Sequence, residues 1–190
     1  MLTTVYRPQL HPLKAHQYGL NLIELIIVLA IAAFLIAIAA PSFDNVIARN
    51  NVIAEANRIV SSINHARSEA VNKQQVVTLS RNSTTARDWS DGWTTYIDSG
   101  GEGNQNLSNG DLLLKEHETT SAQITINTDS DGDQWISFDA SGRLIETGNV
   151  RIAVCDTDLS NGFEGRLIDI NLVGRTQIVS ITQSAGNCAP

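Results

Sequence analysis

A lone carboxylate lies inside the longest apolar run of the chain. Glu24 is the fifth residue of the run Leu20–Ala40, which contains no Lys or Arg. A helix over this run would be about 30 Å long, which matches the hydrocarbon core of a bilayer. Because an isolated carboxylate in hydrocarbon costs at least about 2.5 kcal/mol, Glu24 needs either a cationic partner or access to water. The run therefore predicts a membrane-inserted segment that carries a single acid.

Two arrangements satisfy this carboxylate. Cleavage between Gly19 and Leu20 would create an amino terminus at the membrane interface, and Glu24 of one subunit could then neutralise the Leu20 ammonium of its neighbour. Alternatively, Glu24 snorkels to the lipid headgroups, since it lies only one helical turn inside the boundary. The residues alone favour neither arrangement. A secretory signal peptide fits less well, because its cleavage site would follow the apolar run, where Pro41 and Ser42 match it only loosely.

The sequence offers little for catalysis. His65 and His117 are the histidines that remain after such a cleavage, and neither has a neighbouring Cys or Ser motif. No Gly-rich phosphate loop follows an expected strand. Cys188 lies two residues from the end of the chain, which is an unsuitable place for a positioned nucleophile. We therefore predict a protein that is not an enzyme and that needs no cofactor.

One loop has the composition of a calcium site. Asp129, Asp131 and Asp133 alternate with Ser130 and Gly132, and carboxylate oxygens around a glycine turn suit Ca²⁺. The bidentate Glu that closes an EF-hand loop is missing, so we expect a solvated acidic turn and assign no metal.

The chain contains two cysteines, Cys155 and Cys188. In a protein that leaves the cytosol such a pair predicts one disulfide. The alternative is two buried free thiols.

The element that positions Glu24 is a long helix. Helical periodicity continues from Phe43 to Asn72, and Pro41 is expected to kink the helix without ending it, because the pattern resumes at once. The face expected to pack on a domain contains Val46, Ile53, Ala56, Val60, Ile63, Ala66 and Ala70. The opposite, solvent-facing side contains Arg49, Asn51, Glu55, Arg58, Ser62 and Arg67.

Beyond the helix the apolar period changes to two, which is typical of strands. The turns between them are rich in Gly, Asn, Ser and Asp, which favours antiparallel sheets packed on the helix. The expected fold is α+β, with a leader at 1–19, a transmembrane or filament-core half-helix at 20–44 and a globular domain at 45–190. The predicted strands are Gln75–Ser80, Trp93–Asp98, Asp111–His117, Gln123–Asn127, Trp135–Asp139, Val150–Val154, Arg166–Asn171 and Arg175–Thr182.

The segment Gly19–Leu25 resembles the prepilin-peptidase site of type IV pilins and type II secretion pseudopilins. In that family a short basic leader ends in Gly, the mature chain begins with a large apolar residue, Glu follows at the fifth mature position, and a Pro follows where Pro41 lies here. Leu20 and Asn21 depart from the usual residues at their positions. The resemblance implies cleavage after Gly19, N-methylation of the Leu20 amine by the same peptidase, and a register-setting role for Glu24 in filament assembly.

A narrower resemblance covers the globular part. The chain is similar to the pseudopilin H and FimT/FimU minor-pilin family in Ala66–Ala70, Val76–Leu79, Asp91-Gly92-Trp93, Phe138-Asp139 with Gly142-Arg143, and Gly174-Arg175. It implies a minor type IV pilin of the tip or initiation complex, with a pseudopilin of a type II secretion system as the alternative. The expected partners are prepilin peptidase, other pilins and, before assembly, the inner membrane. The globular domain is expected in the periplasm, and the assembled protein in an extracellular pilus or a periplasmic pseudopilus. A Cys155–Cys188 bridge that holds the C-terminal tail fits the pilus better.

Members similar to FimT also bind DNA through a Gly-Arg-x-Arg motif. The matching string here is Gly174-Arg175-Thr176-Gln177, in which Gln replaces the second Arg. Arg175, with Arg166 and Arg143 as neighbours, is the candidate DNA-binding patch. The chain carries 13 Lys and Arg against 20 Asp and Glu, a formal charge of −7, which repels nucleic acid. DNA is therefore a disfavoured partner.

Overall fold

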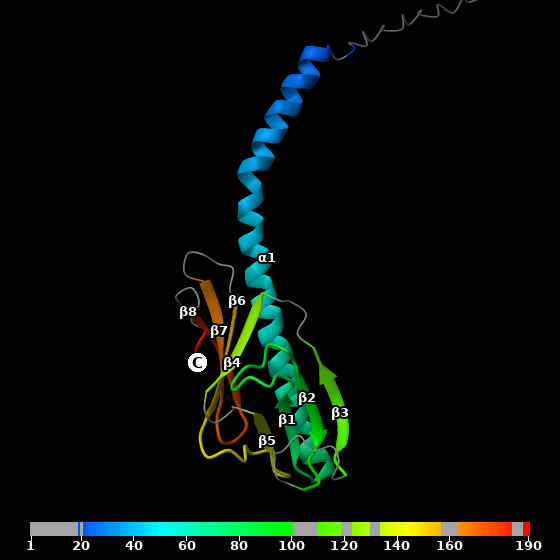
Figure 1. The fold of residues 1–190 in the computed structure, drawn as a ribbon, viewed down its shortest axis with the longest axis vertical. Coiled ribbons are helices and arrows are strands. Elements are labelled where there is room, and N and C mark those ends of the chain that lie inside the picture. Colours follow the sequence, from blue (N-terminus) through cyan, green and yellow to red (C-terminus); the bar gives the residue numbers. More distant parts are fainter. Residues whose placement is uncertain are drawn as a thin grey trace, which may run out of the picture. The chain divides into compact units, whose positions relative to one another are not determined.

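A computed structural model of the chain describes residues 19, 21–100, 110–118, 123–129, 134–156, 163–183 and 188–190, and for 39–44, 163 and 183 the backbone alone. The described residues form one helix, α1 (Leu22–Lys73), followed by eight strands (Figure 1). The contacts divide the chain into two units, residues 1–41 and residues 42–190.

In the first unit α1 is apolar on every side. Its large side chains between Leu22 and Ile38 are 50–75% exposed in the isolated chain. The backbone remains helical through Pro41, as predicted, and the kink itself stays a prediction. Across the described residues, no helical stretch reaches the combined length and apolarity that a membrane crossing requires. Leu20, where the predicted span begins, lies outside the described residues, so the span also stays a prediction.

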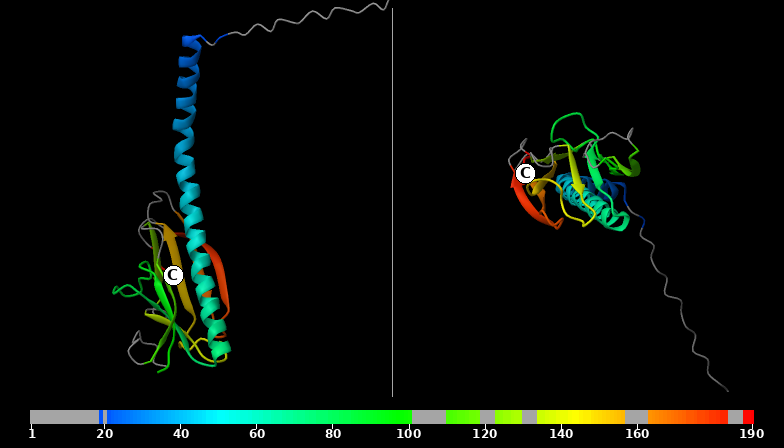
Figure 2. Two further views of the ribbon diagram at one scale, coloured as in Figure 1. Left: turned by 90° about the vertical axis from the view of Figure 1, so that its right-hand side faces the viewer. Right: turned by 90° about the horizontal axis from the view of Figure 1, so that it is seen from below.

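In the second unit α1 packs against two antiparallel sheets (Figure 2), which confirms the predicted α+β fold. Sheet A has the strand order β3-β2-β1-β5, and sheet B has the order β4-β6-β7-β8. The strands are β1 Val77–Arg81, β2 Trp93–Ile97, β3 Leu112–His117, β4 Ile124–Thr128, β5 Trp135–Phe138, β6 Val150–Asp156, β7 Phe163–Ile170 and β8 Thr176–Gln183. All eight predicted strands are confirmed, with ends shifted by at most three residues.

The core lies between α1 and both sheets. Side chains alternate between the two faces of a strand, so every second residue points toward the helix. Trp89 and Trp93 are fully buried, whereas Trp135 is half-buried. The other apolar side chains of this core include Val77, Leu79, Ile97, Ile124, Ile126, Ile136, Phe138, Val150, Ile152, Val154, Ile168 and Ile170.

The buried stripe of α1 differs from the predicted one. It begins at Val52 and continues through Ala56, Ile59, Ile63, Ala66 and Ala70, whereas Val46 is 55% exposed. Glu55 and Ser62, predicted to face solvent, are only 2% and 4% exposed. Both are tolerated there because they have internal partners: Glu55 pairs with Arg58 at 3.2 Å, and the Ser62 hydroxyl donates to the Arg58 carbonyl at 3.1 Å.

The two sheets differ on the face turned away from the helix. In sheet A this face buries polar side chains, including Thr78, Tyr96 and Ser137. In sheet B it carries a small apolar cluster of Ala153 and Cys155 with Leu167, Ile181 and Cys188.

Candidate functional site

The predicted assembly residues lie at the beginning of α1. Gly19 is exposed, and a Cβ built on it would meet none of the described residues within 4 Å. Glu24 lies in the first helical turn with its side chain exposed, and a carboxylate there interacts favourably with the helix dipole. No cation lies within ion-pair distance of Glu24 among the described residues. Its carboxylate is therefore accessible to a cation from another chain, while Leu20 lies outside the described residues.

The predicted disulfide is confirmed. Cys155 on β6 and Cys188 near the C-terminus are bonded, with their Cα atoms 5.9 Å apart. The Asn127 side-chain amide donates to the Cys188 carbonyl at 2.7 Å. These two links hold the end of the chain on the outer face of sheet B.

Of the candidate calcium-binding loop, only Asp129 lies within the described residues. Asp131 and Asp133 lie outside the described residues. Asp129 accepts a hydrogen bond from the Arg151 backbone at 3.0 Å, and its carboxylate lies 3.7 Å from the Arg151 guanidinium. Within the described ranges no three metal-ligating side chains come together.

The two Gly-Arg motifs of the sequence meet in space. Gly142 and Gly174 both have a positive φ, of 76° and 75°. A Cβ on Gly174 would lie 2.4 Å from the Gly142 carbonyl oxygen, so the two turns touch through their backbones. Arg67 on α1 donates from Nε to the same carbonyl oxygen at 2.8 Å. The structure thus places Arg143 and Arg175 beside one backbone contact.

Arg67 is the site residue that sequence reasoning missed, since we expected it to face solvent. It is half-buried and joins the helix to both turns. Both Gly-Arg pairs and Arg67 belong to the segments that carry the family resemblance. That shared membership was the available signal, but the sequence does not show that these segments touch.

Arg166 does not join this group. Its guanidinium donates to the Ser180 hydroxyl, and Arg166 is paired with Ser180 across β7 and β8. The turn Asn171–Arg175 closes the same hairpin five residues further along, roughly 17 Å away at the ordinary strand rise. The structure therefore brings Arg143 and Arg175 together but not Arg166, and DNA binding by these residues stays a prediction.

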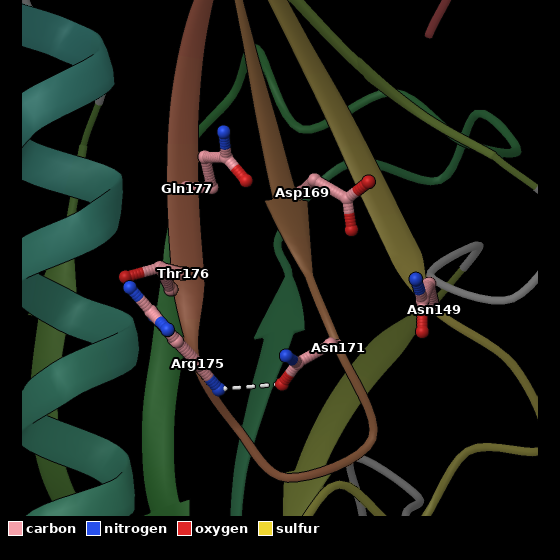
Figure 3. Close-up of a pocket in the computed structure, with 6 residues that line it drawn as sticks. All are labelled: Asn149, Asp169, Asn171, Arg175, Thr176 and Gln177. Atoms are coloured by element: carbon pink, nitrogen blue, oxygen red, sulfur yellow. Dashed lines mark hydrogen bonds between the residues drawn. The ribbon is translucent and has the colours of Figure 1, made fainter.

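A polar pocket of about 470 Å³ adjoins the turn (Figure 3). The Asn171 side-chain oxygen accepts a hydrogen bond from the Arg175 backbone at 2.9 Å, which fixes the turn beside it. The lining residues are Asn149, Asp169, Asn171, Arg175, Thr176 and Gln177. Three amides, a hydroxyl, one acid and one base offer donors and acceptors but no activated nucleophile.

The loop between β5 and β6 also contains a fixed carboxylate. Asp139 accepts hydrogen bonds from the Ser141 backbone, the Ser141 hydroxyl and the Arg143 backbone at 2.6–3.0 Å. Desolvation acts to raise the pKa of Asp139, but these hydrogen bonds and the charge of Arg143 outweigh it and hold the pKa below its usual value. Asp139 therefore shapes its own loop rather than serving as an acid.

The ring of His117 contributes to the packing of the globular unit. Its ring stacks on Trp93 with the centroids 5.4 Å apart. Burial lowers the pKa of His117, and the charges of Lys115, Arg58 and His65 act in the same direction. Its Nε2 atom is buried and has no hydrogen-bond partner among the described residues.

Comparison with solved structures gave two crystal forms of the type IV minor pilin FimU from Pseudomonas aeruginosa. The first is 22% identical with a TM-score of 0.59, covering 73% of this chain and 97% of that one. The second is 20% identical with a TM-score of 0.55, covering 70% and 98%. At these identities the likeness shows the fold. Comparison with curated proteins found no match.

The comparison with protein families identifies the family of this chain. Residues 55–174, more than half of the chain, match the family described as type II transport protein GspH. The matched range begins inside the buried stripe of α1 and ends at Gly174 in the β7–β8 turn. The chain therefore belongs to the GspH family of type II transport proteins, and it shares the fold of a type IV minor pilin.

Proposed function

We propose that this chain is a minor type IV pilin, a structural subunit of the tip complex that initiates pilus assembly. The observation that carries the proposal is the first part of α1, where apolar side chains on all sides are exposed and Glu24 is the single acid. Such a surface needs cover from lipid or from other helices, since exposed aliphatic area of this extent is unfavourable in water.

In this proposal the leader directs the precursor to the inner membrane, with Leu20–Ala40 inserted and the globular unit in the periplasm. Prepilin peptidase cleaves after Gly19 and methylates the Leu20 amine. The helix then leaves the bilayer and packs among the helices of other pilins in the extracellular pilus. The accessible Glu24 carboxylate sets the axial register by pairing with the Leu20 amine of a neighbour, because an unpaired charge in an apolar interior is costly.

The test is replacement of Glu24 by Ala in the full chain. We expect leader cleavage to continue, because the Gly19–Leu20 bond is unchanged, while the amount of this subunit in sheared pili falls about tenfold or more, as for a lost buried pair of 1.4 kcal/mol or above. Mass spectrometry of the mature N-terminus and immunoblots of sheared pili measure the two steps. Asn21→Ala is the matched control, since it removes a polar side chain from the same segment without changing the charge.

Wild-type amounts of the Glu24→Ala subunit in pili would contradict the register role. A wild-type subunit that is absent from sheared pili would contradict the pilin assignment itself.

The secretion pseudopilin is the second candidate, because the matched family is described as type II transport. The disulfide that holds the C-terminal tail favours the pilus instead. Deletion of the gene separates the two functions. Loss of pili with normal protein secretion supports the pilus subunit, and the reverse pattern supports the pseudopilin.

A further inference from the structure

One surface of the globular unit combines exposed aliphatic side chains with arginines. We name it the hairpin-end surface and define it as Val71, Arg143, Leu172, Val173 and Arg175. Val71, Leu172 and Val173 are 42%, 41% and 54% exposed. Arg143 and Arg175 are also exposed. The five residues come from the end of α1, the β5–β6 loop and the β7–β8 turn.

Hydrogen bonds hold these three segments together. The Leu144 amide donates to the Leu172 carbonyl at 3.1 Å, which ties the loop to the turn. Arg67 Nε ties the helix to the Gly142 carbonyl at 2.8 Å. Within the turn the Gly174 amide donates to the Asn171 carbonyl at 2.8 Å. A surface fixed in this way loses little conformational entropy when a partner binds.

The arginines of this surface differ from others in the described part of the chain. Arg49, Arg58 and Arg151 each form an ion pair with a carboxylate, at 3.1–3.7 Å. Arg143 and Arg175 form no ion pair within 4 Å among the described residues. Asp139 in the β5–β6 loop feels the charge of Arg143 but already accepts three hydrogen bonds from its own loop. Asp169 is the acid among the residues that line the adjoining pocket.

We propose that the hairpin-end surface docks an acidic segment of a neighbouring filament subunit, in which carboxylates flank apolar side chains. The inference rests on the proposed function, because it takes the partner to be another subunit of the same filament. Partner carboxylates pair with Arg143 and Arg175, and partner aliphatic groups cover Leu172 and Val173. Arginine next to buried aliphatic area is the composition that protein interfaces favour.

The charge of the chain and the position of this surface favour an acidic protein segment over DNA or a lipid bilayer as its partner. DNA phosphates would leave Leu172 and Val173 uncovered, and two arginines give a salt slope of only about 2. The net charge of −7 also repels a long polyanion. The apolar run that suits a lipid bilayer is Leu20–Ala40, a different segment of the chain from this surface.

The experiment measures binding of the full-length, detergent-solubilised chain to each detergent-solubilised pilin and pseudopilin of the same organism. Arg175→Glu is compared with Arg166→Glu, because both change the charge by two units within the β7–β8 hairpin. We expect Arg175→Glu and Val173→Asp to weaken binding about tenfold or more, the effect of an interface residue worth 1.4 kcal/mol. Arg166→Glu should change it less than about twofold, and Arg175→Lys should keep most of it, since Lys preserves the charge.

Four outcomes overturn the inference. The first is that Arg166→Glu weakens binding as much as Arg175→Glu does, which would show that binding depends on net charge and not on this surface. The second is unchanged binding by Arg175→Glu and Val173→Asp when their disulfide and melting temperature match the wild type. The third is a wild-type chain that binds short double-stranded DNA or a second copy of itself through these residues but binds no pilin. The fourth is a wild-type chain that binds nothing tested.

Failure of the inference can be told apart from failure of the proposed function. Pili that contain the Arg175→Glu and Val173→Asp subunits in normal amounts would overturn the docking surface and leave the pilin assignment standing. Absence of the wild-type subunit from pili would overturn the pilin assignment.

Discussion

Sheet A and sheet B each contain four antiparallel strands and each turn an apolar face toward α1, but their opposite faces are closed by different chemistry. Sheet B covers its outer face with a short apolar cluster and the disulfide-bonded tail. Sheet A instead buries hydroxyl groups, and Thr78 Oγ1 lies 2.9 Å from Ser137 Oγ across β1 and β5.

The difference shows two ways of making a small sheet stable on both sides. A disulfide acts mainly by restricting the unfolded chain, so its contribution depends little on the exact packing around it. Buried hydrogen bonds contribute about 1 kcal/mol each and depend on every partner being present. Tyr96 packs on the same polar face of sheet A, and burial raises the pKa of its hydroxyl group. Three sets of substitutions test whether the two sheets are stabilised in these different ways.

The largest effect is expected at the turn that closes sheet B. Gly174→Ala should lower the free energy of unfolding by about 3 kcal/mol or more, because the new Cβ meets the Gly142 carbonyl oxygen and also occupies a strained positive φ. Gly110→Ala is the matched control, since Gly110 has a φ of 91° and none of the described residues lies within 4 Å of its Cβ position. That control should cost only the backbone strain, about 1 kcal/mol. Urea unfolding followed by Trp fluorescence measures both, and equal losses would mean that the contact between the turns contributes nothing.

Removal of the disulfide should come next. The double variant Cys155→Ser/Cys188→Ser is expected to lose about 2–4 kcal/mol, given a sequence separation of 33 residues. Hydrogen exchange should show the loss of protection first in β4, β6 and β7, with β1 and β2 following only at global unfolding. Reduction of the wild type with a thiol is the control for the substitutions. Equal loss of protection in both sheets would show that the tail stabilises the whole unit instead of sheet B.

The smallest effect is expected in the polar face of sheet A. Ser137→Ala should destabilise the fold by about 1 kcal/mol, because it leaves the Thr78 hydroxyl with a poorer partner. Combining it with Thr78→Val should cost less than the two single changes added together, since both partners of one hydrogen bond are then gone. A double-mutant cycle in urea measures this coupling. Strict additivity would show that the two hydroxyls do not depend on each other.

The sequence predicted local structure well and long-range contacts poorly. All eight strands follow from apolar alternation and from turn residues, which are properties of neighbouring positions. The disulfide followed from the expected compartment and from there being only two cysteines. Burial of Glu55 was missed because its pairing with Arg58 offsets the cost, and periodicity does not register such a pair. The contact between Gly142 and Gly174 was missed because it depends on how two loops far apart in the chain are brought together.

The order of the strands has a kinetic consequence. The chain places β1, β2 and β3 in sheet A, β4 in sheet B, β5 back in sheet A and β6 to β8 in sheet B. Sheet A is therefore incomplete until β5 has been synthesised and paired with β1, and β4 cannot pair until β6 has been synthesised. Pairings of this sequence separation are slow, because the loop must close before any contact forms. We expect the two sheets to form in one late, cooperative step, and a chain truncated before Trp135 to lack both.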